Sequence, residues 1–132
     1  MRAPSWKVCS VAALSAVVGL GSALSYSQAA DGDEKTKHTI KQVMKIAHDK
    51  DSGLLKKVLG GQASAEEKKQ LLDAYISLVE GKPSKGDESS WHLLSGKVAL
   101  AAAKVVVGRE GAEKELEAAT NCKACHSVHK GS

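Results

Sequence analysis

The stretch NCKACHSVHK, residues 121 to 130, contains the side chains best suited to carry out chemistry or bind a metal. Cys122 and Cys125 are two of the three cysteines in this chain of 132 residues, and His126 directly follows the second of them. Residues three apart lie close to one face of a helix, so the two thiols and the imidazole would project together. Such a group could be a redox dithiol, a disulfide, part of a zinc site or a haem attachment site.

Three of these four chemistries fit the rest of the chain poorly. A thioredoxin-like dithiol needs a βαβ context, and no stretch of this sequence alternates as a strand does. A disulfide across three residues closes too short a loop to add much stability. A zinc site needs two more ligands, and only His126 and His129 are near, at a spacing that departs from the usual one. A small metal clip of this kind remains an alternative.

The order Cys-x-x-Cys-His is typical of covalent haem attachment. Each thiol can add to a vinyl group of the porphyrin to form a thioether, and His126 then presents a ring nitrogen to the iron. We therefore predict one covalent haem c, with Cys122 and Cys125 as its attachment points and His126 as the proximal iron ligand. A haem would also supply a large apolar group to a chain that contains no Phe.

Residues 1 to 30 are predicted to be a cleaved secretory signal peptide. Arg2 and Lys7 form a basic start, an apolar run follows from Val8 to about Leu24, and small residues precede the expected cleavage site. An uncleaved membrane anchor is the alternative, because the run nearly reaches spanning length. Export agrees with haem c, which is attached outside the cytoplasm, and we expect a periplasmic protein whose one domain covers residues 31–132.

Charge argues against a nucleic-acid partner. Loss of Arg2 and Lys7 with the signal peptide lowers the formal net charge from +4 to +2. The remaining chain has one Trp and one Tyr, Trp91 and Tyr75, so few aromatic rings could stack on bases. We expect no nucleic-acid binding, and no membrane association after signal cleavage.

Apolar residues recur at helical spacing along the rest of the chain. Ser64 and Glu67 have the spacing of a capping box, and Gly81 with Pro83 ends the helix that it starts. The predicted helices cover about residues 40–59, with a bend or an interruption at Gly53, and residues 64–80, 91–107 and 110–129. Four helices with short links predict an all-α fold, an antiparallel four-helix bundle.

With its haem motif on the last helix, the chain resembles the class II c-type cytochromes, the cytochrome c′ family. The resemblance covers about residues 35–130 and rests on NCKACHSVHK and on IKQVMK, residues 40–45. It implies a four-helix bundle with haem attached to the C-terminal helix. His129 and Lys130 stand where the family usually has an aromatic and a basic residue, and His129 is expected at the haem edge or the surface.

The resemblance also implies a position on the first helix that faces the iron from the distal side. That position is Met44, and a thioether there would be the sixth ligand, as in the low-spin members of the family. Periodicity alone favours Met44 as ordinary core. His38 and His48 are rival ligands, and an open sixth position is a further alternative. Ile40 replaces the arginine that the family often has one turn earlier.

A six-coordinate haem suits one-electron transfer, and we predict an electron-transfer protein that serves unidentified redox partner proteins. No residue set suggests catalysis, so we do not expect an enzyme. The alternative is a five-coordinate, cytochrome c′-like protein that binds or senses diatomic gases. The resemblance also makes a homodimer an expectation, because class II relatives often pair through their first two helices.

Overall fold

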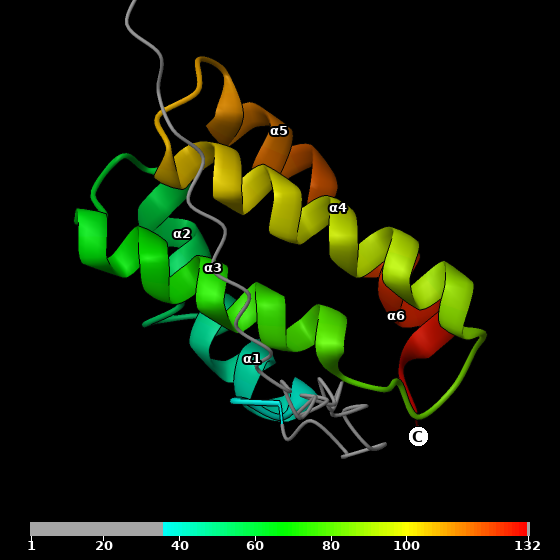
Figure 1. Cartoon of the computed structure of the whole chain (residues 1–132). Coiled ribbons are helices and arrows are strands. Elements are labelled where there is room, and N and C mark those ends of the chain that lie inside the picture. Colours follow the sequence, from blue (N-terminus) through cyan, green and yellow to red (C-terminus); the bar gives the residue numbers. More distant parts are fainter. Residues whose placement is uncertain (1–35, 132) are drawn as a thin grey trace, which may run out of the picture. The chain divides into compact units, whose positions relative to one another are not determined.

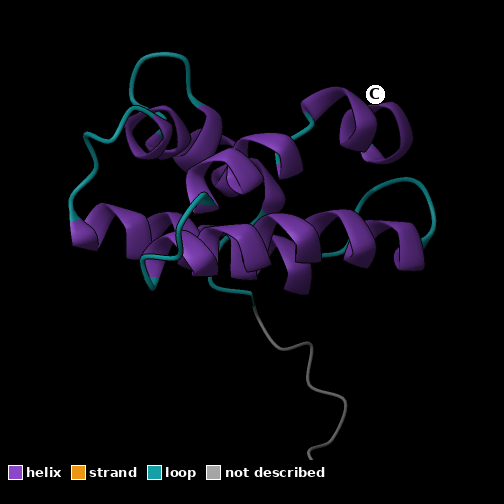
Figure 2. Cartoon of the chain, turned by 90° about the horizontal axis from the view of Figure 1, so that it is seen from above, coloured by secondary structure: helices purple, strands orange, loops and turns teal. Residues whose placement is uncertain are grey.

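The computed structural model describes residues 36–131, so the predicted signal peptide lies outside the described residues. This part of the chain contains six α-helices and no strand (Figures 1 and 2). The all-α prediction is therefore confirmed for the described residues. The helices are α1 (Ile40–His48), α2 (Leu54–Leu59), α3 (Ala65–Glu80), α4 (Glu88–Val106), α5 (Ala112–Ala119) and α6 (Cys122–His129).

The first predicted helix is two helices in the structure, α1 and α2. Asp49 ends α1, and its Oδ1 accepts hydrogen bonds from the backbone N–H groups of Asp51 and Ser52, both at 3.0 Å. An Asp side chain that bonds the backbone just ahead favours a turn over a continued helix. Of the two predicted possibilities at Gly53, a bend or an interruption, the structure has the interruption, and Gly53 is the N-cap of α2.

The two long helices begin at side-chain caps. The Ser64–Glu67 capping box at the start of α3 is confirmed, and α3 ends at Gly81 as expected. The cap of α4 is Asp87, whose carboxylate accepts from the Ser90 N–H at 2.8 Å. This helix therefore starts three residues before the Trp91 start that the sequence suggested, because an Asp cap was available upstream.

The predicted C-terminal helix of residues 110–129 is also divided, into α5 and α6. The Thr120 hydroxyl donates to the carbonyls of Leu116 and Glu117 at the end of α5. Asn121 then caps α6 by accepting from the Ala124 N–H at 3.0 Å. The Cys-x-x-Cys-His motif therefore occupies the first turns of a new helix.

The core forms where α3 and α4 lie side by side, with α5 against α4 and α1 against α3 (Figure 1). Its buried apolar residues come from α1 to α5, and α6 contributes only the half-buried Cys125 at its edge. Tyr75 and Trp91 are its aromatic members. Among the described residues, no helix has the length and apolar character needed to cross a membrane.

Candidate functional site

A cleft with mostly apolar walls lies between α1, α3, α4 and the segment that leads from α5 into α6. The volume of the cleft is about 570 Å³, including the part that is open to solvent. All four predicted site residues line it: Met44 from α1, and Cys122, Cys125 and His126 from α6. The structure thus brings together residues from the two ends of the described chain.

The two cysteines are free thiols in the structure and differ in exposure. Cys122 is exposed, with its Sγ 3.6 Å from the Thr120 carbonyl oxygen, and Cys125 is half-buried. Burial raises the pKa of the Cys125 thiol, and the nearby Cys122 adds to the effect. The turn capped by Asn121 sets this geometry, because it starts α6 at Cys122 and leaves both thiols on the cleft side.

Two candidate iron ligands on α1 line the cleft, Met44 and His48, one turn apart. Burial lowers the pKa of His48, and the neighbouring His126 lowers it further. His48 is therefore neutral near pH 7, which is the form of imidazole that binds metals. The other rival, His38, does not line the cleft, and its Nε2 lies 3.6 Å from the Asp73 carboxylate.

Tyr75 of α3 also lines the cleft, and the sequence had not indicated it as a site residue. Its side chain is fully buried, and its hydroxyl has no hydrogen-bond partner among the described residues. Burial raises the pKa of Tyr75 above its ordinary value of 10.0, so the phenol stays protonated. The feature that could have indicated Tyr75 from the sequence is its hydroxyl group, because a buried Tyr hydroxyl usually needs a hydrogen-bond partner.

The expectation of a surface position for His129 is wrong, whereas its expected place at the haem edge stays a prediction. His129 is only 4% exposed, and its ring packs edge-on against Trp91 with centroids 5.4 Å apart. Its Nδ1 lies 3.0 Å from the Lys85 carbonyl, so it must donate there, and its Nε2 can then accept from the Ser90 hydroxyl at 2.7 Å. A zinc clip that used His129 would have to break at least one of these bonds.

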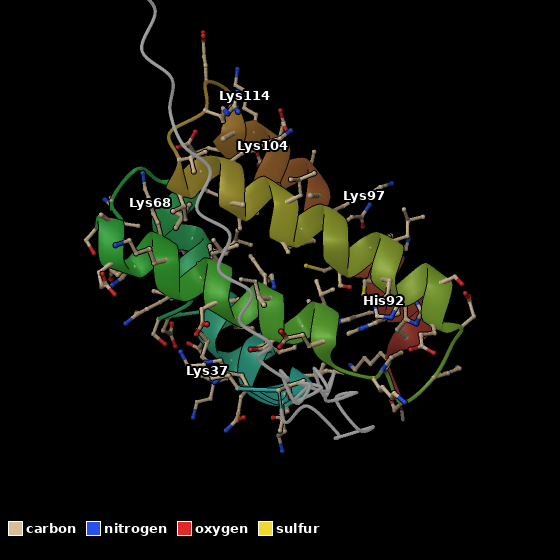
Figure 3. All side chains as sticks on the ribbon, viewed as in Figure 1. Lys37, Lys68, His92, Lys97, Lys104 and Lys114 are labelled. Carbon is tan, nitrogen blue, oxygen red and sulfur yellow. The ribbon has the colours of Figure 1, made fainter. Side chains whose placement is uncertain are left out.

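Several charged side chains outside the cleft lie at the surface of the described chain. His92 is exposed, and its Nε2 lies 3.5 Å from the Glu88 carboxylate on the same helix. Lys104 pairs with Glu115 and so links α4 to α5 (Figure 3). Within residues 36–131, no three His, Cys, Asp or Glu side chains gather closely enough to hold a metal ion by themselves.

The residues of the cleft fit a haem by the chemistry of their donors. Two thiols and an imidazole stand on one wall, a thioether and a second imidazole stand on another, and apolar side chains such as Leu94 and Val98 lie between them. The unpartnered Tyr75 hydroxyl agrees with an occupant that supplies a polar atom.

No family model, curated protein or solved structure matches this chain. Its function must therefore be inferred from the cleft and the residues that line it.

Proposed function

We propose that this chain is a haem c electron-transfer protein that works in the periplasm. The observation that carries the proposal is the cleft itself, where the Cys-x-x-Cys-His residues and Met44 line one mostly apolar space. A motif match alone could be accidental. A match whose residues face an apolar cleft with a further iron donor on a distant helix is much harder to obtain by chance.

Four residues of the cleft have a definite task in this proposal. Cys122 and Cys125 anchor the porphyrin by thioether bonds, His126 binds the iron on the α6 side, and Met44 is the proposed donor on the α1 side. The bound haem supplies a one-electron ferric–ferrous couple. A thioether donor favours the reduced form, and the apolar wall keeps water from the metal.

We also propose that the haem-loaded chain is a four-helix bundle. Its first member is α1 with α2, its second and third are α3 and α4, and its fourth is α5 with α6. The contacts support this grouping, because α1 and α2 both pack on α3, and α5 and α6 both pack on α4. In this arrangement the haem is attached to the final segment of the fourth member.

One observation favours the second candidate function, the binding of diatomic gases by a five-coordinate haem. Met44 is half-buried and packs against the core cluster, so its side chain could serve packing alone. The sixth position would then be open within an apolar pocket. Partners differ accordingly: redox proteins for electron transfer, a small gas molecule for sensing.

The test is expression of the full-length protein in cells able to mature c-type cytochromes. We expect a periplasmic, coloured protein whose mass exceeds that of the mature chain by one haem, and whose haem stain survives denaturing electrophoresis. The double variant Cys122→Ser/Cys125→Ser should lose the stain. Cys9→Ser is the matched control, since Cys9 lies in the predicted signal peptide, and it should keep the stain. A colourless wild-type protein at the mass of the bare chain would refute the proposal.

A further inference from the structure

Tyr75 is a buried polar group that the proposed haem site has not yet used. Its side chain is 0% exposed, and its hydroxyl oxygen has no hydrogen-bond partner among the described residues. A buried hydroxyl without a partner is rare in proteins, because it has lost its bonds to water and received none in return. We therefore expect the Tyr75 hydroxyl to form a hydrogen bond when a group binds in the cleft, either with that group or with a side chain that moves on binding.

The surroundings of Tyr75 narrow the choice of partner. The tyrosine lines the same cleft as Met44 and His48, the two candidate iron donors of α1. Its ring is in tilted contact with the His48 imidazole, with centroids 5.9 Å apart. The Ser95 hydroxyl, which also belongs to the cleft, already donates to the Trp91 carbonyl at 2.7 Å.

We propose that Tyr75 is a positioning residue for the α1 iron donor, to which its hydroxyl hydrogen-bonds once the haem is in place. The inference rests on the proposed function. In both possible cases the phenol hydroxyl forms a hydrogen bond with an iron ligand. That ligand is either the Met44 thioether or the His48 imidazole. Tyr75 would thereby tune the reduction potential without touching the iron.

The sign of this tuning depends on the partner. If the hydroxyl donates to the Met44 sulfur, it draws electron density from the iron and favours the ferrous form, which raises the potential. If it accepts from the ring N–H of a ligating His48, it makes that imidazole more basic and favours the ferric form, which lowers the potential.

The experiment is a redox titration of the haem-loaded variant Tyr75→Phe, which removes only the hydroxyl. A lower potential than wild type identifies Met44 as the partner, and a higher potential identifies His48. Double variants add a second readout: the shift caused by Tyr75→Phe should vanish in Met44→Leu in the first case, or in His48→Leu in the second. An unchanged potential, or a shift that persists in both double variants, would overturn the inference.

Trp91→Phe is the matched control. The Trp91 ring N–H is also buried and without a partner among the described residues, but Trp91 does not line the cleft. Its loss should leave the potential unchanged. The haem stain distinguishes failure of this inference from failure of the proposed function. A stained Tyr75→Phe protein with the wild-type potential refutes only the role of Tyr75. An unstained wild-type protein refutes the haem site.

Discussion

If the cleft binds the proposed haem, single side chains decide how its iron is coordinated. Met44 and His48 lie one turn apart on α1 and both line the cleft, while His38 lies beside Asp73. A thioether is a soft donor that favours ferrous iron, whereas an imidazole also binds ferric iron well. The identity of the sixth ligand therefore affects both the potential and the capacity of the site to bind added gases.

The substitution Met44→Ala tests the proposed sixth ligand. We expect the methionine-to-iron charge-transfer band of the ferric protein to disappear and carbon monoxide to bind the ferrous protein at least tenfold faster, because the sixth position is opened. Absorption spectra and flash photolysis measure these changes. Leu55→Ala is the control, since Leu55 is also half-buried against the core but does not line the cleft. If wild type and Met44→Ala have the same spectrum, Met44 serves packing only.

Among the secondary-structure elements, the loop between α3 and α4 has an unexpected role in holding α6. The His129 ring at the end of α6 bonds to Ser90 on α4 and to the Lys85 carbonyl in the loop. Gly86 lies beside this ring with φ +84°, and a Cβ added there would come within 2.5 Å of the His129 Nδ1. The absence of a side chain at Gly86 is thus what admits the imidazole.

Replacement of Gly86 by Ala should therefore destabilise the protein more than replacement of Gly61. Both glycines have positive φ, so each Ala variant carries about 1 kcal/mol of backbone strain. At Gly61 an added Cβ meets nothing within 4 Å, whereas at Gly86 it meets the His129 ring and the Val128 side chain. We expect Gly86→Ala to lose a further ~1–3 kcal/mol, as overpacked sites do, in the free energy of unfolding measured by denaturant titration. Equal losses would show that His129 does not pack there.

For the molecule as a whole, the main consequence of the packing is that α6 is weakly tied to the core. The buried apolar cluster spans α1 to α5, and α6 approaches only α4 among the described helices. Cys122 and His126 of this helix are exposed, and Cys125 is only half-buried. Helices with few buried apolar contacts open at low free energy, so α6 should be among the least stable elements of the haem-free chain.

Hydrogen exchange should show that α6 is less stable than the core helices in the haem-free chain, and that bound haem removes this difference in stability. In the haem-free double variant Cys122→Ser/Cys125→Ser, we expect the amides of α6 to exchange much faster than those of α3 and α4. In the haem-loaded wild type, two thioether bonds and the iron ligand should slow the exchange of α6 toward that of the core. Mass spectrometry of peptides from both proteins measures the effect. Protection of α6 that is the same in both would contradict haem attachment on this helix.

The sequence by itself determined the local features of this protein. The apolar periodicity predicted an all-helical fold, and the Ser64–Glu67 spacing predicted the start of α3, because both depend on residues within a turn or two of each other. The Cys-x-x-Cys-His motif could also be recognised from the sequence, because its residues follow one another on α6.

Only the tertiary structure decided which distant residues share an environment. It placed Met44, His48 and Tyr75 around the cleft that Cys122 lines, and it left the Tyr75 hydroxyl without a partner. It also buried His129 against Ser90, 39 residues away in the chain, which excludes the surface position that was one of the two expected for it. The physical reason is that burial and hydrogen bonding depend on long-range packing, which spacing along one helix does not record.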